Sequence, residues 1–427
     1  MSKEIKATNR AFIRSMKRIA KELDKPESDI SKAQFFAEDL ETLSEWEIRK
    51  AGGFAALKAM FFPAETNLEV KYGSKLLKSH INKVEKAHGQ ALFFEKELVT
   101  AVKEILADNP LVIHKQPPAS KKSTPAATRT VVACISDTHF GANVSKEEMH
   151  GLNEFNWTIA ARRMACFIEQ IANYKLDHRK ETDLLVQING DIIAGLIHNQ
   201  EWFVDLLATQ FSGTVHLLTQ AITYLSTKFK KVKVVCTTGN HGRSMAKSDK
   251  GRATTNKWDS YETMVYVALK EILSRATPNV EVVVPESPYL VYKVQTHNIC
   301  QTHGDTVINV GNPGKALAMD SILNQVNKMI SSELIKPGES IDVLCVGHVH
   351  VPTVQMLDNG CMAVINGCLS GTDPFAQSIG IFGNNPTQLM FESTPDHAVG
   401  DIRMIQVKSA DKQARFDKII KPFQGKL

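Results

Sequence analysis

The sequence lacks long apolar runs and closely spaced cysteine pairs. No hydrophobic stretch approaches the length of a membrane span, and residues Met1–Glu4 open no apolar signal region, so we expect a cytoplasmic protein with neither a secretory signal nor a membrane segment. The seven cysteines include no C-x-x-C pair, which argues against a thiolate zinc site, and their odd number argues against a disulfide framework. Most of them lie in apolar strand-like runs, where we expect reduced core residues.

Composition is otherwise ordinary for a globular protein. The 427 residues are 43% hydrophobic and 23% charged, which is enough chain for two or three domains with a sizeable core. The net charge of +5 is uneven, because residues 1–130 carry 23 Lys and Arg against 17 Asp and Glu, whereas the remaining residues carry 28 against 29. The basic excess lies in the N-terminal part, where it weakly favours a polyanionic partner.

The first 112 residues have the pattern of a small all-α domain. Residues 10–23 show the apolar periodicity of a basic amphipathic helix. Ser44–Glu47 fits a capping box that opens a short helix, which ends at Gly52-Gly53 before another helix over 54–62. A helix, a glycine turn and a second helix in a basic segment are typical of a helix-turn-helix DNA-binding unit. A helical domain that binds a protein partner or forms a homo-oligomer fits the same pattern equally well.

A proline-rich stretch marks the clearest boundary along the chain. Residues 113–129 combine Pro117, Pro118 and Pro125 with serines and lysines, and such a segment cannot bury a core. We therefore predict a helical, DNA-binding domain over 1–112, an extended linker over 113–129 and a catalytic α/β domain over 130–427.

Five apolar runs in this last domain end in small residues that are followed by metal-capable side chains. We expect each run to be a buried strand, and the fourth, Leu290–Gln301, to be one long strand. The clusters that follow the runs are Asp137-Thr138-His139, Gly190-Asp191, Gly239-Asn240-His241, His303-Gly304-Asp305 and His348-Val349-His350. Taken alone, Gly239-Asn240-His241 is better explained as a strand-end turn, since Asn and Gly are common turn residues. Because open α/β folds bind ligands at the carboxyl ends of their strands, the repetition favours one shared site.

In this order, D-x-H, G-D, G-N-H, a lone His and G-H-x-H resemble the motifs of the calcineurin-like metallophosphoesterases. The resemblance covers roughly residues 130–400 and implies a four-layer αββα sandwich. It also implies an enzyme in which a hydroxide that bridges two divalent metal ions attacks phosphorus. The implied metal ligands are Asp137, His139 and His350 for the first ion, Asn240, His303 and His348 for the second, and Asp191 as the bridge. This mixture of carboxylate, imidazole and amide oxygen suits Mn²⁺, with Fe or Zn²⁺ as alternatives.

Two further residues of the G-N-H region have implied catalytic roles. His241 matches the histidine of the family that protonates the leaving oxygen, and we expect Arg243 to neutralise a non-bridging phosphate oxygen. The segment that follows is rich in cations, and we expect Lys247, Lys250 and Arg252 to bind substrate. A solvated loop is the alternative for such a charge run.

The substrate is suggested by the string Ser136–Gly141. It resembles the DNA-repair nuclease branch of the family, the SbcCD-type enzymes, and the phosphoesterases encoded by phages, so the host cytoplasm is the expected location if a phage encodes the chain. The repair nucleases carry a histidine three residues after the G-D aspartate, where this chain has Ala194, which puts their duplex exonuclease action in doubt. We predict a DNA nuclease that nicks or cuts single strands. A protein or small-nucleotide phosphatase and a non-catalytic scaffold are the alternatives.

Overall fold

The computed structural model describes residues 107–115, 128–178, 182–196, 203–243, 257–308, 319–331, 338–378 and 385–425. The chain divides into two compact units, residues 1–97 and 98–427, and every described residue belongs to the second. Most of the predicted N-terminal domain and of the predicted linker lies outside the described residues, so their boundaries stay a prediction. Within the described ranges, no helix combines the length and hydropathy that crossing a bilayer requires.

A six-stranded mixed sheet lies at the centre of the second unit. Its strands β1, β3, β5 and β6 are parallel. Beyond β1 the sheet continues with β12, which is antiparallel to β1, and with β13, which is antiparallel to β12. Three of the predicted motif-bearing strands, β1, β3 and β5, are therefore neighbours. The strands in sheet order are β13 (Ile402–Gln406), β12 (Thr387–Ser393), β1 (Arg129–Ile135), β3 (Thr182–Asn189), β5 (Val232–Thr237) and β6 (Val280–Val283).

A second, five-stranded sheet contains the other two motif-bearing strands. Its strands in order are β10 (Thr353–Met356), β11 (Met362–Ile365), β9 (Val343–Val346), β8 (His297–Gln301) and β7 (Leu290–Val294). The prediction of a single strand over Leu290–Gln301 is wrong, because this stretch is the antiparallel hairpin of β7 and β8. Gln295 adopts a left-handed backbone with φ of 54°, which reverses the chain between Val294 and His297.

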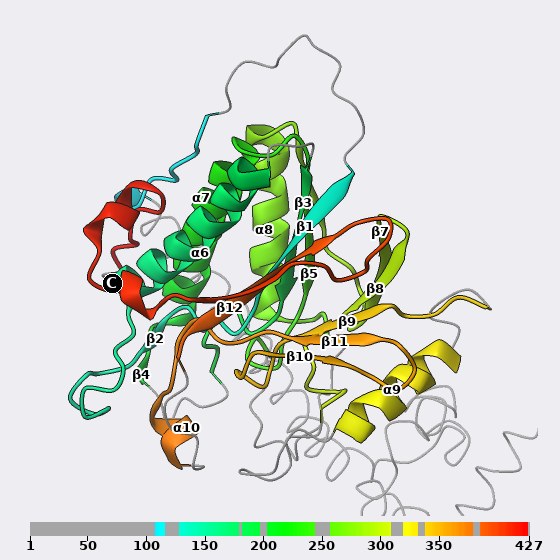
Figure 1. Cartoon of the computed structure of the whole chain (residues 1–427). Helices are drawn as coiled ribbons and strands as arrows, with labels where there is room; N and C mark the ends of the chain where they lie inside the picture. Colours follow the sequence, from blue (N-terminus) through cyan, green and yellow to red (C-terminus); the bar gives the residue numbers. More distant parts are fainter. Residues whose placement is uncertain are drawn as a thin grey trace, which may run out of the picture. The chain divides into compact units, whose positions relative to one another are not determined.

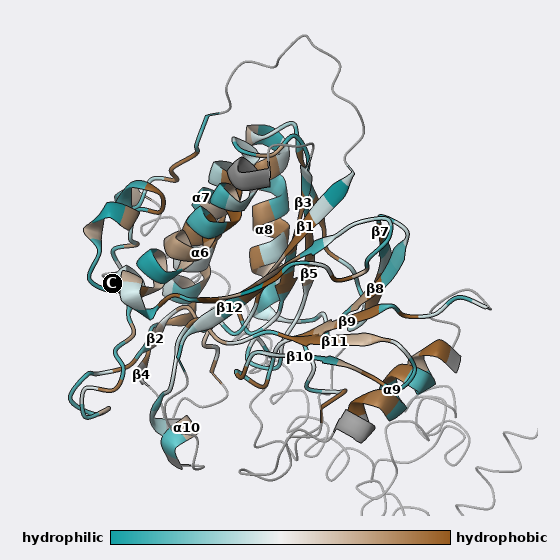
Figure 2. Ribbon diagram, viewed as in Figure 1, coloured by the Kyte–Doolittle hydropathy of each residue, from teal (hydrophilic) through white to brown (hydrophobic). Residues whose placement is uncertain are grey.

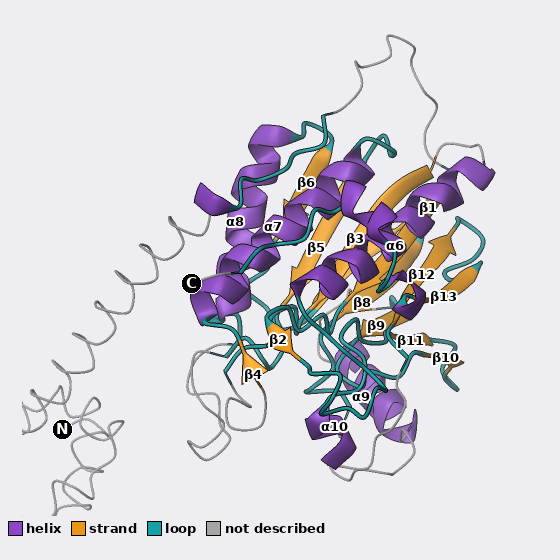
Figure 3. Cartoon of the chain, turned by 90° about the vertical axis from the view of Figure 1, so that its left-hand side faces the viewer, coloured by secondary structure: helices purple, strands orange, loops and turns teal. Residues whose placement is uncertain are grey.

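Helices cover the outer faces of both sheets, as Figures 1 and 3 show. Three long helices pack on the six-stranded sheet, namely α6 (Trp157–His178), α7 (Leu207–Ser226) and α8 (Tyr261–Ala276). Helix α9 (Met319–Ser331) packs on the five-stranded sheet. The short elements are β2 (Ala142–Asn143), β4 (Phe203–Val204), α10 (Pro374–Ser378), η2 (Lys408–Ala410) and η3 (Ala414–Lys418).

Alternating side chains on the strands create three apolar layers. On β1, Val131 and Ala133 pack toward the three long helices, whereas Val132 packs between the two sheets. On β9, Leu344 packs toward α9 and Cys345 between the sheets. Figure 2 shows β9 and β11 as mainly hydrophobic, as expected for strands that are covered on both faces. The described residues thus form the predicted order of helix, sheet, sheet and helix.

The seven cysteines belong to these buried layers. All are buried and none forms a disulfide bond, which confirms the prediction of reduced core residues.

Residues 107–115 pack against the end of the chain. Asn109 exchanges two hydrogen bonds with the backbone of Gln424, at 2.8 and 3.1 Å. The backbone N–H of His114 donates to Thr223 Oγ1, and its ring Nε2 donates to the carbonyl oxygen of Ile419. This segment therefore belongs structurally to the α/β unit.

Candidate metal centre

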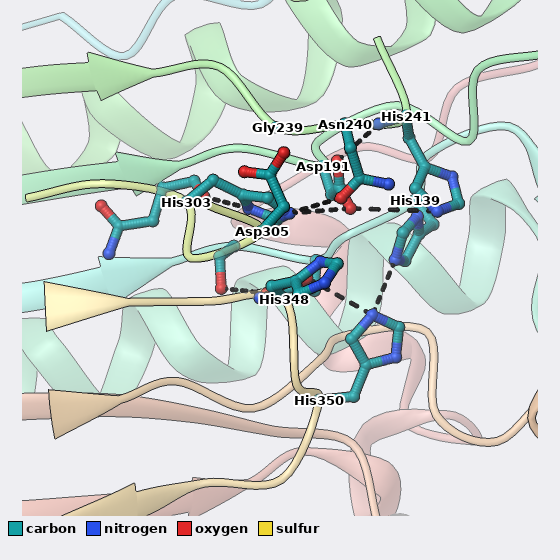
Figure 4. Close-up of polar contacts among 12 residues, drawn as sticks. His139, Asp191, Gly239, Asn240, His241, His303, Asp305, His348 and His350 are labelled. Atoms are coloured by element: carbon teal, nitrogen blue, oxygen red, sulfur yellow. Dashed lines mark hydrogen bonds and ion pairs between the residues drawn. The ribbon is translucent and has the colours of Figure 1, made fainter. Parts of the chain in front are cut away.

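Parallel strand pairing brings the five predicted motifs to one edge of the two sheets. Ile135 of β1 pairs with Ile188 of β3, and Asn189 pairs with Thr237 of β5, so these three strands end almost level. In the other sheet β8 is parallel to β9. The polar residues that follow these strands converge, as Figure 4 shows. Asp137 and His350 lie on the same side of the sheets, as the sequence predicts.

The first cluster consists of Asp137, His139 and His350. The Nε2 atom of His350 lies 3.3 Å from Asp137 Oδ1 and 3.1 Å from His139 Nε2. One ligand atom from each of the three residues lies within 4.8 Å of the others. Asp137 and His139 are fully buried, and His350 is half-buried.

The second cluster consists of Asp191, Asn240, His303 and His348. His303 Nε2 lies 3.0 Å from Asp191 Oδ2 and 3.1 Å from Asn240 Oδ1. The ligand atoms of Asp191, His303 and His348 lie within 4.8 Å of one another. Asp191 also forms such a group with His139, which belongs to the first cluster, and with His241. Asp191 therefore occupies the position between the clusters that a bridging ligand requires.

Left-handed backbone conformations concentrate at these residues. Seven non-glycine residues of the described part have positive φ, and five of them are predicted ligands: Asp137, His139, Asp191, His348 and His350, with φ between 45° and 68°. This conformation is disfavoured for residues with a Cβ and is retained mainly where surrounding structure enforces it, often at functional sites. It also explains how His348 and His350, only two residues apart, reach different clusters.

Two glycines allow the backbone to approach the carboxylates. A Cβ at Gly239 would lie 2.0 Å from Asp191 Oδ1, and a Cβ at Gly347 would lie 2.4 Å from Asp137 Oδ2. A side chain at either position would displace a predicted ligand. Glycine is thus required in G-N-H and G-H-x-H because the backbone at these positions lies against a carboxylate, with no space for a Cβ.

Backbone carbonyls and amides orient the ligand side chains. His303 Nδ1 donates to the carbonyl oxygen of Asn189 at 2.7 Å, and the carboxylate of Asp137 accepts from the backbone N–H of His348 at 3.0 and 3.1 Å. Because a carbonyl oxygen only accepts, the proton on His303 Nδ1 is fixed and Nε2 faces the cluster. Such outer hydrogen bonds are characteristic of metal-ligating histidines.

Glu262 of α8 is a buried carboxylate that sequence reasoning missed. It accepts the backbone N–H of Gly239 at 2.6 Å and that of Ile192 at 2.7 Å. These two residues directly adjoin Asn240 and Asp191. Burial, together with the charge of Asp191, raises the pKa of Glu262 to about 7, although the two N–H bonds act in the opposite direction. Glu262 lies in the first turn of α8, two residues after the cap Ser260, and nothing in the sequence there indicates that its side chain is buried.

The electrostatics of the cluster fit a bound cation. Burial and the neighbouring His303 lower the pKa of His348 to about 4, so its imidazole is neutral and has a free lone pair. Burial also acts to lower the pKa of His303, but the carboxylate of Asp191 has the larger effect, and the pKa of His303 rises to about 9. His303 Nε2 faces two oxygen acceptors, Asp191 Oδ2 and Asn240 Oδ1, which only a proton or a metal ion between them reconciles. The donor set therefore fits the metal ions that the sequence predicts.

The predicted substrate residues have mixed outcomes. Lys247, Lys250 and Arg252 lie outside the described residues. The guanidinium of Arg243 pairs with Asp305, with 3.4 Å between Nη2 and Oδ2. Asp305 is a second residue that sequence reasoning did not assign, although it directly follows His303-Gly304.

His241 lies beside both clusters. Its Nδ1 donates to the carbonyl oxygen of Ala194 at 2.8 Å, and its Nε2 lies 3.9 Å from Asp191 Oδ2. The rings of His241 and His139 contact edge to face, with centroids 4.5 Å apart. Burial lowers the pKa of His241, and the charge of Asp191 partly opposes this.

Comparisons with known proteins give similarity at the level of solved structures alone. No family model matches the sequence, and no curated protein matches it. The chain is similar to a conserved uncharacterized protein, a predicted phosphoesterase, from Streptococcus pneumoniae TIGR4, with 12% identity and a TM-score of 0.27 over 66% of this chain and 99% of that chain. It is also similar to a 5′-nucleotidase from Candida albicans SC5314, with 10% identity and a TM-score of 0.31 over 70% and 58% of the two chains.

A dimetal phosphatase from Danio rerio shows 9% identity and a TM-score of 0.33 over 65% of this chain and 99% of that chain. At these levels of similarity, the functional argument rests on the motifs and the geometry of the site.

Proposed function

We propose that the chain is a dinuclear metal-dependent phosphodiesterase of the calcineurin-like type. One observation carries this proposal: seven predicted ligands from five strand ends form two adjoining clusters that meet at Asp191. Asp137, His139 and His350 would hold one ion, and Asn240, His303 and His348 the other. When bound, the two ions would supply Lewis-acid chemistry, activating water and offsetting the charge of the phosphate. Mn²⁺ suits the donor set, with Fe or Zn²⁺ as alternatives.

The chain's own contribution to the reaction centres on a proton transfer by His241. In the hydrolysis, a water molecule gives up a proton to solvent as its oxygen bonds to phosphorus, the bond from phosphorus to the ester oxygen breaks, and that ester oxygen takes up a proton. Because Nδ1 of His241 is committed to Ala194, Nε2 is the atom that can donate this proton. The carboxylate of Asp191, 3.9 Å away, favours the imidazolium that donation requires.

We propose DNA as the substrate, with nicking or single-strand cleavage as the action. The basic excess of residues 1–130 supports a polyanionic partner, as does the pair of cations Arg243 and Lys257 near the second cluster. The position of the histidine that the repair nucleases use is held by Ala194, whose carbonyl instead orients His241. A protein or small-nucleotide phosphatase remains the alternative within the same chemistry.

A substrate panel tests this proposal. The full chain would be assayed with Mn²⁺ on single-stranded, duplex and nicked DNA, RNA, a phosphopeptide and a nucleoside monophosphate. We expect cleavage of single-stranded or nicked DNA that stops on addition of EDTA. Release of phosphate from the phosphopeptide or the nucleotide, with intact DNA, would instead identify a phosphatase. An absence of hydrolysis throughout, with Mn²⁺, Fe²⁺ or Zn²⁺, would leave a scaffold protein.

A further inference from the structure

Asp305 holds two cations beside the second cluster. Its Oδ2 pairs with Arg243 Nη2 at 3.4 Å, and its Oδ1 is in close contact with Lys257 Nζ. The Asp305 side chain is 8% exposed, whereas the two cations keep 32% and 14% of their side-chain surface exposed. The carboxylate thus lies underneath, and the positive groups reach the surface.

Each of the three residues is anchored to a predicted ligand segment. Asp305 follows His303 by two residues, and Figure 4 shows it beside that histidine. The carbonyl oxygen of Lys257 accepts from Thr238 Oγ1 at 3.0 Å, and Thr238 lies two residues before Asn240.

The backbone of Arg243 is held both by the preceding G-N-H segment and by a pairing with a residue later in the chain. It follows His241 by two residues and forms a β-bridge with Ser260, whose hydroxyl donates to the neighbouring Gly242 carbonyl at 2.9 Å. The two cations are therefore held at defined positions relative to Asn240 and His303.

The charge balance of this group leaves a positive surplus. One carboxylate faces one guanidinium and one ammonium, so the three side chains carry a net charge of +1. An ion pair between one carboxylate and one cation would have no net charge, so the second cation gives this group its positive charge. A partly exposed Arg and a partly exposed Lys, held close together by one carboxylate, form a favourable binding site for a phosphate group. This positive group adjoins the metal clusters without contributing a ligand to them.

We propose that Arg243 and Lys257, positioned by Asp305, bind a second phosphate group next to the one that is hydrolysed. This role replaces the contact with the hydrolysed phosphate that the sequence led us to expect for Arg243, because its guanidinium pairs with Asp305. This inference rests on the proposed function and defines its substrate class as a diester flanked by a further phosphate, as in an oligonucleotide strand. Asp305 acts as a positioning residue, because it contacts the two cations and not the phosphate.

The test uses chromogenic esters that differ by one phosphate. Thymidine 5′-(4-nitrophenyl phosphate) is compared with its 3′-phosphorylated form, and thymidine 3′-(4-nitrophenyl phosphate) with its 5′-phosphorylated form. The full chain with Mn²⁺ should release nitrophenol with a kcat/KM at least about tenfold higher for the flanked ester of one pair, since a charge-assisted contact is worth that much or more. Lys257→Met should bring this ratio close to one, and Lys257→Arg should restore part of it.

Matched variants distinguish the positioning role of Asp305 from a general loss of structure. Lys233→Met removes an exposed lysine from the opposite end of β5, so its ratio should equal that of the wild type. Asp305→Asn should lower the ratio mainly through KM of the flanked ester, which a merely structural role of Asp305 would not do. A wild-type ratio near one in both pairs, or an unchanged ratio in Lys257→Met, would overturn the subsite while the proposed function stands. No release of nitrophenol from any of the four esters would contradict the proposed function itself.

Discussion

His241 has one ring nitrogen committed to the backbone and the other facing the clusters. His241→Ala should leave metal content unchanged but slow the hydrolysis of diesters with alkyl leaving groups by roughly 10²–10⁴-fold, because these require protonation of the departing oxygen. A nitrophenolate leaves without that proton, so 4-nitrophenyl esters should be affected far less. His297→Ala, which removes a histidine that contacts the Thr394 carbonyl, serves as the control. Equal losses on both substrate types would contradict the role.

The same proton transfer predicts a pH dependence. Burial lowers the pKa of His241 below its usual 6.5, so the donating imidazolium is present only at acidic pH. For alkyl esters, kcat/KM should therefore fall as the pH rises through a value below 6.5, and this fall should be absent in His241→Ala. Steady-state rates between pH 5 and pH 8 on the two ester types provide the measurement.

Glu262 illustrates a functional residue that no sequence pattern reveals. Glu262→Ala leaves two buried N–H groups, those of Gly239 and Ile192, without their acceptor, which should lower the free energy of unfolding by about 2–6 kcal/mol. It should also weaken metal binding, because both N–H groups adjoin predicted ligands. Glu262→Gln retains one acceptor oxygen and should lose about half as much stability in urea denaturation. Unchanged stability and metal affinity in Glu262→Ala would show that the two loops hold their shape without it.

At the scale of elements, the strand-end turns set the positions of the ligands. Gly239→Ala should sharply reduce metal affinity, measured by calorimetric titration, because its methyl group would overlap Asp191 Oδ1. Gly360→Ala is the matched control, since Gly360 also lies in a turn after a strand and a methyl group there would meet nothing within 4 Å. Its left-handed backbone should cost about 1 kcal/mol of stability and no metal affinity. Wild-type affinity in Gly239→Ala would mean that the turn can move without disturbing Asp191.

The sequence predicts elements well where apolar runs and motifs coincide. The runs before Asp137, Asp191 and Asn240 are neighbouring parallel strands. Each could be predicted because it is a continuous apolar run that ends in polar residues. The β7–β8 hairpin was not predictable, because its turn at Gln295-Thr296 contains neither Gly, Asn nor Asp. Asp305 and Glu262 could not be assigned for a related reason: their roles depend on partners that are distant in the sequence.

At the scale of the whole molecule, the contacts of residues 107–115 define where a truncation can be made. Removing 1–97 retains the bonds of Asn109 and His114 to the α/β unit, which removing 1–112 would partly break. If the N-terminal unit binds DNA, the shortened protein should bind DNA more weakly and with a flatter salt dependence, while it still hydrolyses a small diester. Filter binding at several salt concentrations measures this. An unchanged affinity and salt slope would assign the N-terminal unit another role.

The central claim is that two metal ions bound at the junction of the five strand ends carry out phosphoester hydrolysis. The most direct measurement is metal content per chain, by mass spectrometry after equilibration with Mn²⁺, together with hydrolysis of bis(4-nitrophenyl) phosphate. We predict two ions per wild-type chain, loss of metal and activity in Asp191→Ala, and neither loss in the exposed control Asp358→Ala. Full hydrolysis in the presence of EDTA, or wild-type metal content and activity in Asp191→Ala, would contradict the account.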